Sequence, residues 1–269
     1  MRATELTKLA EGREAELYAW EDGQVLRLMR NPDALSWLEQ QAAALEAARA
    51  AGVRVPAVYG LTTVMDRPGM IMERISGQDL LTVLGGKPWL IFRVAAITGK
   101  THARLHQVAA PPGVGSLKER LARQISSGAV PQELVPFALG ALGPLPDGDR
   151  LCHGDFHPGN IMLQDGAPVV IDWSNVASGD PTADYARCQL MWHTGSLPPG
   201  TSIALRVMSS FGRSVLTWGY NRSYARISKP DPDLVRSWMV PVAAARLAEG
   251  IETERDDLLR FLRRSASPA

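Results

Sequence analysis

The order of secondary-structure signals most constrains the fold of this chain, because strand-like and helix-like patterns occupy separate parts of it. Short β-prone runs lie before residue 76, at residues 15–20, 25–29, 53–59 and 70–75. Helix-like patterns dominate afterwards, at residues 88–108, 131–142, 181–193, 203–220 and 232–264. This segregation predicts an α+β fold with two lobes, residues 1–75 and 76–269, and a ligand-binding cleft between them.

Two helix starts carry specific local signals. Asn31 and Pro32 are typical of an N-cap and a first helical position, and Gly52 is typical of a helix end, so one helix is expected inside the strand-rich lobe. Ser116 and Glu119 have the spacing of a capping box, which predicts another helix start in the second lobe.

Composition indicates an ordinary globular protein rather than a nucleic-acid-binding or membrane protein. The 269 residues are 45% hydrophobic and carry a net charge of +1, which can build a sizeable core and lacks a basic excess. The longest early helix pattern contains arginine and lysine, so no membrane span is expected. The two cysteines, Cys152 and Cys188, and an N-terminus without the apolar core of a signal peptide favour a cytoplasmic location.

The most chemically informative segment is residues 153–160, His-Gly-Asp-Phe-His-Pro-Gly-Asn, followed by a predicted buried strand at residues 169–172 that ends at Asp172. Phosphoryl transfer needs a group that orients the nucleophile and metal ions that neutralise phosphate charge. Asp155 supplies a carboxylate that can accept the proton of a substrate hydroxyl. Asn160, five positions later as in the protein-kinase catalytic loop, and Asp172 supply oxygen ligands that suit Mg²⁺. The segment therefore predicts phosphoryl transfer with Asp155 as the base.

The pattern HGDxHxxN followed by IDW resembles the aminoglycoside phosphotransferase and choline kinase-like superfamily. The resemblance implies a protein-kinase-like fold, with an antiparallel sheet and one helix in the nucleotide-binding lobe and a mainly helical lobe for catalysis and acceptor binding. It implies an ATP-dependent kinase that uses Mg²⁺ and phosphorylates a hydroxyl of an aminoglycoside-like antibiotic, an amino sugar or another small polar metabolite. GTP as the donor, and a monomer or a homodimer, are left open.

The resemblance also nominates residues for the nucleotide. Gly12 lies in the loop that would cover the phosphates, and Arg27 takes the place of the kinase strand lysine. Glu73 and Ile75 lie in the segment whose backbone would bind the adenine edge.

One departure from the kinase pattern concerns the partner of that cation. Kinases pair it with a glutamate on a helix, whereas the corresponding position here is Gln41. Either Gln41 hydrogen-bonds Arg27 without a charge, or Glu39 or Glu46 replaces the missing carboxylate.

Further residues are expected to support the loop or to meet the acceptor. His153 would brace the catalytic loop, and Asp184, in Gly-Asp-Pro-Thr-Ala-Asp, would tie the backbone of that loop from the start of a helix. His157 and Trp192 are candidates for contact with the substrate. A cationic acceptor would need several carboxylates, and an acidic run that is otherwise typical of a solvated helix face offers Glu249, Glu252, Glu254, Asp256 and Asp257.

Two other functions remain open at this point. A nucleotide-binding protein with little catalysis would retain the pocket, and the presence of Gln41 leaves room for it. A two-metal phosphoesterase would use the alternating His153, Asp155 and His157 as ligands and would need additional histidines or aspartates from other loops. Of the remaining histidines, His102 and His106 lie four positions apart on a helix that looks structural.

Overall fold

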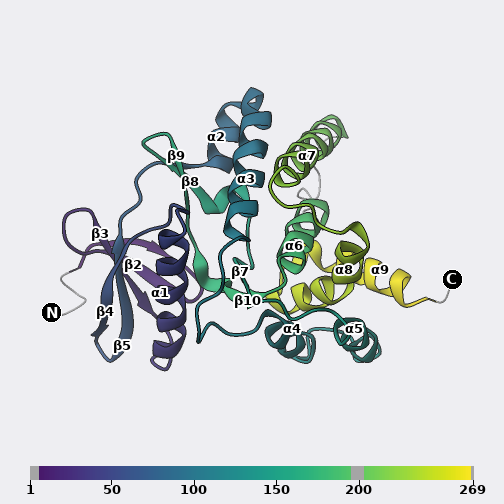
Figure 1. Ribbon diagram of the computed structural model, residues 1–269, viewed down its shortest axis with the longest axis horizontal. Helices are drawn as coiled ribbons and strands as arrows, with labels where there is room; N and C mark the ends of the chain where they lie inside the picture. Colours follow the sequence, from purple (N-terminus) through teal and green to yellow (C-terminus); the bar gives the residue numbers. More distant parts are fainter. Residues whose placement is uncertain (1–5, 195–202, 268–269) are drawn as a thin grey trace.

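The computed structural model describes residues 6–194 and 203–267, which form two lobes (Figure 1). The N-terminal lobe is an antiparallel five-stranded sheet of order β1-β2-β3-β5-β4, with one helix, α1 (Leu35–Ala50), packed against it. The strands of this sheet are β1 (Lys8–Glu11), β2 (Ala15–Ala19), β3 (Gln24–Met29), β4 (Val58–Val64) and β5 (Arg67–Glu73). The rest of the chain is mainly helical, which confirms the predicted α+β architecture.

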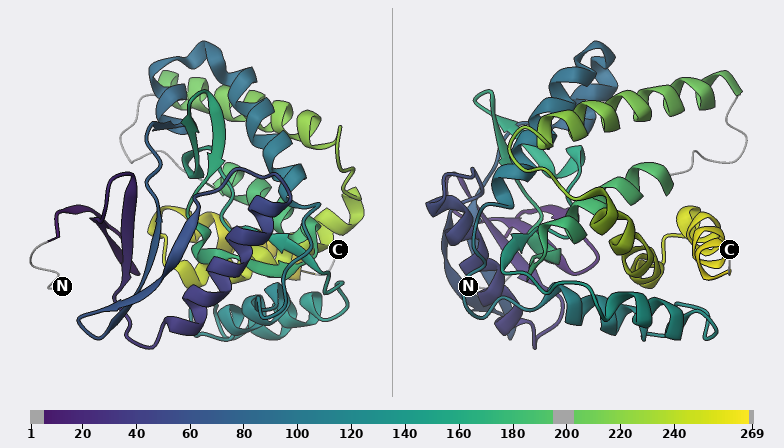
Figure 2. Two further views of the ribbon diagram at one scale, coloured as in Figure 1. Left: turned by 60° about the vertical axis from the view of Figure 1, so that its left-hand side comes forward. Right: turned by 45° about the vertical axis from the view of Figure 1, so that its right-hand side comes forward.

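The C-terminal lobe combines helices with two small sheets (Figure 1, Figure 2). Its α-helices are α2 (Leu80–Gly86), α3 (Ile91–Leu105), α4 (Leu117–Ile125), α5 (Val135–Leu142), α6 (Pro181–Thr194), α7 (Ile203–Tyr224), α8 (Pro232–Arg246) and α9 (Glu252–Ala266). The strands are β6 (Gln78–Asp79), β7 (Arg150–Cys152), β8 (Ile161–Gln164), β9 (Ala167–Val170) and β10 (Ala177–Gly179). The 3₁₀ helices within the described ranges are η2 (Pro88–Leu90), η3 (Pro158–Asn160), η4 (Trp173–Asn175) and η5 (Leu247–Glu249). Helix α7 packs along α3, on the opposite side of the lobe from α4 and α5.

Helix α1 forms because apolar residues recur at helical spacing on the face that it turns toward the sheet. Leu38, Ala44 and Leu45 are buried on that face, and the polar Gln41 is fully buried among them. A buried amide on an otherwise apolar face requires a polar partner, because leaving it unpaired disfavours the folded state. Gln41 therefore needs a hydrogen-bond partner from the neighbouring sheet.

Two boundaries in the N-terminal lobe differ from the sequence prediction. Helix α1 begins at Leu35 instead of Pro32, because Asn31 Oδ1 accepts a hydrogen bond from the amide of Asp33 and forms a local turn instead of capping the helix. The strand expected at residues 53–59 begins only at Val58 as β4, since residues 53–57 do not pair in the sheet, although Val53, Val55 and Pro56 are buried.

A two-residue turn connects β4 to β5. It is formed by Met65 and Asp66, both with positive φ (52° and 57°), which is the two-residue geometry that matches the twist of a β-hairpin. Pro68 is part of β5 and pairs with Thr63 of β4.

The two lobes share one buried apolar cluster. Leu38 of α1 and Met70 of β5 belong to the same cluster as Phe156 of the catalytic loop and Trp173 of η4. The predicted boundary after residue 75 falls in the connection between β5 and β6. Because the apolar core continues across this connection, the lobes are packed against each other rather than merely linked.

In the C-terminal lobe, Ser116 caps α4 as predicted, with its side-chain oxygen accepting from the amide of Glu119 (3.3 Å). The helical stretch predicted at residues 232–264 is instead two helices, α8 and α9, separated at Gly250, which has a φ of +68°. Across the described ranges, no helix combines the length and apolar character needed to cross a membrane.

Candidate active site

A cavity of about 640 Å³ lies between the lobes. It is lined by the β1–β2 loop, by strands of the sheet, by α1, by the connection after β5 and by the segment around η4. All seven residues nominated for nucleotide or metal lie along it: Gly12, Arg27, Gln41, Glu73, Ile75, Asn160 and Asp172. The fold therefore brings residues from both lobes to one space of the size that holds a small-molecule ligand.

Arg27 lies in the middle of β3 and is held by groups from α1. Its guanidinium donates a hydrogen bond to Oε1 of Gln41 and lies over the ring of Trp37, 5.3 Å from the ring centroid. Burial lowers the pKa of Arg27, and the negative charges of Asp172 and Glu14 oppose this effect. The neutral amide of Gln41 thus takes the position of a carboxylate, and its Nε2 has no hydrogen-bond partner within the described part of the chain.

Glu73, which also lines the cavity, is held by hydrogen bonds within the fold. Its carboxylate accepts from the amide of Ala57 (3.1 Å) and from Nε2 of Gln164 (3.3 Å). The bond from Gln164 joins the end of β5 to the β8–β9 hairpin of the second lobe. Ile75 follows in the connection between the lobes and contributes to the cavity wall.

The catalytic loop is braced by His153, which is fully buried. Its Nε2 donates to the carbonyl of Ile171 (3.0 Å), and its Nδ1 accepts from the amide of Asp155 (3.3 Å). Burial lowers the pKa of His153, so the neutral ring is favoured. The ring therefore connects the loop that carries Asp155 to the segment just before Asp172.

Asp155 and Asn160 are joined by the turn between them. Asn160 Nδ2 donates to the backbone oxygen of Asp155 (2.9 Å), which leaves its amide oxygen available for another ligand. His157 fixes the turn, since its Nδ1 accepts from the amide of Gly159 (3.0 Å), and its Nε2 lies 3.7 Å from Oδ2 of Asp155. The predicted proximity of Asp155 and Asn160 is present in the fold.

The carboxylate of Asp155 is stabilised in its charged form. Burial acts to raise its pKa, but hydrogen bonding to His157 and the positive charge of Arg187 outweigh burial and hold the pKa well below the ordinary value. An ionised carboxylate at neutral pH is the form that can accept a proton.

Asp172 does not end a strand as predicted. Strand β9 ends at Val170, and Asp172 follows with a φ of +58° as the residue before η4. A left-handed backbone conformation is uncommon for a residue other than glycine, and aspartate and asparagine tolerate it better than most residues do. This conformation directs the chain from the hairpin into η4 while Asp172 stays on the cavity wall, and Ser174 Oγ donates to its Oδ1.

The oxygen groups of Asn160 and Asp172 fit a magnesium ion. One is a neutral amide oxygen and the other an anionic carboxylate, and both face the same cavity. Mg²⁺ binds such hard oxygen donors and keeps waters and phosphate oxygens as its other ligands. Two protein ligands are therefore a suitable number for this ion.

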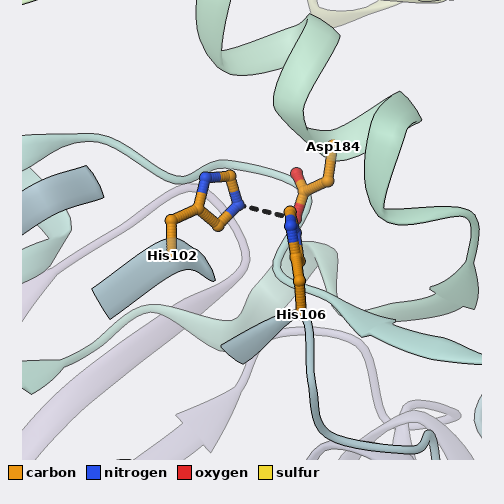
Figure 3. Close-up of side chains that lie close together, drawn as sticks. All are labelled: His102, His106 and Asp184. Atoms are coloured by element: carbon orange, nitrogen blue, oxygen red, sulfur yellow. Dashed lines mark hydrogen bonds and ion pairs between the residues drawn. The ribbon is translucent and has the colours of Figure 1, made fainter. Parts of the chain in front are cut away.

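Asp184 is the centre of a buried polar cluster at the start of α6 (Figure 3). Its carboxylate accepts from the backbone amides of His153 (2.6 Å) and Gly154 (3.0 Å), which confirms the predicted contact with the catalytic loop. The Nε2 atoms of His102, in α3, and of His106, directly after α3, each lie 3.3 Å from its Oδ2. Burial opposes ionisation, but the hydrogen bonds from the two histidines hold the pKa of Asp184 well below its ordinary value.

This cluster has metal-binding residue types but is satisfied without a metal. Tyr220 and Tyr224 lie at 2.7 and 2.6 Å from the Nδ1 atoms of His102 and His106, so each ring has a partner on both nitrogens. Among the described residues, these two histidines and Asp184 form the sole group of three potential ligands within 4.8 Å of one another. A two-metal phosphoesterase would use His153, Asp155 and His157. The ligand atoms of these three residues do not all lie within 4.8 Å of one another.

The pH dependence of stability provides a test of this cluster. Burial, followed by the neighbouring His106, lowers the pKa of His102 to about 3. Because the unfolded state binds protons more readily, the contribution of a neutral His102 is complete above pH 6.5 and is lost as the pH falls toward 3. Between pH 7 and pH 5, the stability advantage of the wild type over His102→Gln should shrink by about 2 kcal/mol, measured by urea unfolding. An advantage that is the same at both pH values would contradict this assignment.

Sequence reasoning missed two arginines beside the base. Arg187 Nη2 lies 3.4 Å, and Arg246 Nη1 3.7 Å, from Oδ1 of Asp155. Both arginines also pair with Glu249. The spacing of Arg187, three positions after Asp184 on α6, places the two on the same helix face and was an available signal.

The candidate substrate residue Trp192 lies apart from these groups. It is buried in an aromatic cluster, edge-on to Tyr220 with a centroid distance of 4.6 Å, and it is not part of the cavity lining. The acidic run near the C-terminus is also divided, since Glu254 is buried against Arg246 while Glu252 and Asp256 are exposed.

Comparison with solved structures shows the same fold in small-molecule kinases. An amicoumacin kinase in complex with AMP-PNP, Ca²⁺ and Ami has a TM-score of 0.64 at 14% identity, over 98% of this chain and 88% of that one. An aminoglycoside phosphotransferase, APH(4)-Ia, in a ternary complex with AMP-PNP and hygromycin B has a TM-score of 0.65 at 16% identity, with 99% and 95% covered. A macrolide 2′-phosphotransferase from Brachybacterium faecium has a TM-score of 0.53 at 23% identity, with 98% and 93% covered.

No curated protein sequence matches this chain. The family model for phosphotransferase enzymes, however, matches residues 5–217, which include the interlobe cavity, the catalytic loop and Asp184. The match confirms the class of enzyme that the motif predicts. This chain belongs to the phosphotransferase enzyme family.

Proposed function

We propose that this phosphotransferase transfers the γ-phosphoryl group of Mg-ATP to a hydroxyl of a small molecule. The observation that carries the proposal is that Arg27, Asn160 and Asp172 line one interlobe cavity while Asn160 is hydrogen-bonded to the backbone of Asp155. A cation for phosphate, oxygen ligands for a metal and an ionised base are the groups that phosphoryl transfer requires.

In the proposed mechanism, Asp155 accepts the proton of the acceptor hydroxyl as the acceptor oxygen forms a bond to the γ-phosphorus and the bond from phosphorus to the leaving ADP oxygen breaks. Arg27, held by Gln41, pairs with phosphate oxygens of the nucleotide. Asn160 and Asp172 hold Mg²⁺, which when bound neutralises phosphate charge. His153 and Asp184 keep the loop in the geometry that places Asp155 at the reacting oxygen.

We assign the nucleotide to the interlobe cavity, which strands of the N-terminal sheet help to line. Gly12, in the β1–β2 loop, would then cover the phosphates, and the backbone at Glu73 and Ile75 would bind the adenine edge; all three residues line the cavity. Related folds have been solved with AMP-PNP, and one aminoglycoside phosphotransferase with GDP and kanamycin. ATP is therefore proposed as the donor, with GTP as the alternative to compare.

A coupled binding and turnover screen tests the function. The purified protein is incubated with Mg-ATP or Mg-GTP and aminoglycosides, macrolides, amino sugars and hydroxy acids, and both melting temperature and nucleoside diphosphate release are followed. A ligand that binds the native state raises the melting temperature with its concentration. An acceptor should raise both the melting temperature and the release of nucleoside diphosphate.

A different outcome is nucleotide binding without acceptor-dependent turnover across the panel. That outcome would favour a nucleotide-binding protein with little catalysis, for which the neutral Gln41 is the supporting observation.

The role of Arg27 gives a separate prediction. Arg27→Met should raise the KM for ATP by roughly 10- to 100-fold, because a charge-assisted hydrogen bond to phosphate contributes about 1.5–3 kcal/mol. The matched control is Arg54→Met, since Arg54 is exposed and its side chain donates only to the carbonyl of Gln164. Steady-state kinetics with varied ATP provides the measurement. An unchanged KM for ATP in Arg27→Met would remove this arginine from the nucleotide site.

A further inference from the structure

Arg13, in the loop between β1 and β2, reaches across to the helical lobe. Its Nη1 donates a hydrogen bond to the backbone oxygen of Glu249 in η5, 236 positions later in the chain (3.2 Å). Arg13 also lines the interlobe cavity, together with the candidate magnesium ligands Asn160 and Asp172. Arg13 therefore lies at the part of this cavity where the β1–β2 loop approaches η5.

The positive charge of Arg13 is not neutralised by a carboxylate. Within residues 6–194 and 203–267, no carboxylate oxygen lies within 4.0 Å of its guanidinium nitrogens. Glu249 offers Arg13 only its backbone oxygen, because its Oε1 binds Arg187 (2.6 Å) and its Oε2 binds Arg246 (2.7 Å). A guanidinium has five N–H groups, and the hydrogen bond to Glu249 uses one of them. Since Arg13 is exposed, its remaining N–H groups can bind a ligand that enters the cavity.

The hydrogen bond from Arg13 to Glu249 can be exchanged for a stronger one. It is exposed, it joins a cation to a neutral oxygen, and its length is at the upper end of the range for N–H···O bonds. Hydrogen bonds from a guanidinium to phosphate oxygens join two charges, are shorter and can form in pairs. The cavity of about 640 Å³ has room for a nucleotide with its phosphates. A phosphate in this cavity is therefore the preferred partner of Arg13.

The contacts of Glu249 indicate which phosphate this is. Oε1 of Glu249 binds Arg187, whose Nη2 lies 3.4 Å from Oδ1 of Asp155. Arg13 thus approaches the cavity on the side of the proposed base. In a transfer from ATP to a hydroxyl held by Asp155, the γ-phosphate is the phosphate that has to lie nearest to Asp155.

We infer that Arg13 binds the γ-phosphate of the nucleotide donor and compensates the negative charge of the phosphoryl group during its transfer. This inference rests on the proposed kinase function and adds a second cation to its site. Arg13 keeps its protons throughout, because a guanidinium stays charged. Asp155 still takes the proton of the acceptor hydroxyl, and the ADP oxygen keeps the electron pair of the bond that breaks. An arginine that contacts the transferred group is an established means of stabilising its charge in phosphoryl transfer.

The test compares two nucleotides that differ in the γ-phosphate. Isothermal titration calorimetry in the presence of Mg²⁺ gives the Kd for AMP-PNP, which has a γ-phosphate, and the Kd for ADP, which lacks it. Arg13→Gln should raise the Kd for AMP-PNP roughly 10- to 100-fold, as expected for the loss of a charge-assisted hydrogen bond. The Kd for ADP should stay close to its wild-type value, which also verifies that the variant is folded. The ratio of the two Kd values should therefore rise about tenfold or more.

The matched control is Arg74→Gln. Arg74 is also an exposed arginine that lines the cavity, but it follows Glu73, whose backbone is assigned to the adenine. Its loss should leave the ratio of the two Kd values unchanged. An unchanged ratio in Arg13→Gln, including equal weakening of both nucleotides, would mean that Arg13 only holds the loop and would overturn the inference. An equal rise of the ratio in Arg74→Gln would also overturn it, because the effect would then be one of general charge.

Turnover provides the second measurement. With an acceptor found by the screen, Arg13→Gln should lower kcat by about 10²-fold or more, because the positive charge would act on the transferring group itself. An unchanged kcat would contradict the role in charge compensation. Failure of the wild type to bind either nucleotide would instead count against the proposed function.

Discussion

Replacing Asp155 by asparagine is expected to lower kcat by about 10²–10⁴-fold while the affinity for ATP stays similar. The substitution preserves size and removes the ability to accept a proton. Asp155 lies outside the group of residues that line the interlobe cavity, and Asn160 donates to its backbone oxygen (2.9 Å) and, over a longer distance, to its Oδ2 (3.5 Å). The effect should therefore appear in turnover rather than in nucleotide binding, and single-turnover kinetics with Mg-ATP and the acceptor identified by the screen measures it.

The control for this substitution is Asp165→Asn. Asp165 lies in the turn between β8 and β9 with a φ of +52°, is exposed, and tolerates asparagine because both residues adopt that conformation. Its variant should keep wild-type turnover. If Asp155→Asn retained full turnover with an acceptor that the wild type phosphorylates, Asp155 would not be the base.

The second large effect is expected on stability. Asp184→Asn should reduce the free energy of unfolding by about 3–5 kcal/mol, the range found when one partner of a buried charged network is removed. The carboxylate of Asp184 is fully buried and accepts hydrogen bonds from two backbone amides and two histidine rings. An asparagine amide offers one acceptor oxygen and turns a donor toward groups that are themselves donors.

Equilibrium unfolding in urea measures this loss, with Asp233→Asn as the matched control. Asp233 also lies in the first turn of a helix, α8, but it is exposed and pairs only with Arg236. Exposed pairs of this type contribute about 0–1 kcal/mol. A loss below about 1 kcal/mol in Asp184→Asn would mean that the catalytic loop is held by other contacts.

Local spacing was sufficient to predict the catalytic loop. The turn at Pro158 and Gly159 is short, so Asn160 has to return toward Asp155, and the structure has the hydrogen bond between them. Likewise, Ser116 could be recognised as a cap because its partner Glu119 is three positions away. Where the deciding contacts were more distant, the prediction was wrong: residues 53–57 do not pair in the sheet, and Asp172 lies beyond the strand that was expected to contain it.

The sequence by itself determined the order of strands and helices and, through the resemblance of its motif, the reaction class, since both are encoded by residues close together in the chain. The surroundings of the base were decided only by the tertiary structure. Arg187 is 32 positions from Asp155 and Arg246 is farther still, and the two meet Asp155 because α6 and α8 pack together. Long-range packing leaves little local pattern in the sequence: the spacing from Asp184 could have indicated Arg187, but Arg246 has the periodicity of an ordinary helix position. The ion pairs around Asp155 are thus a property of the folded chain.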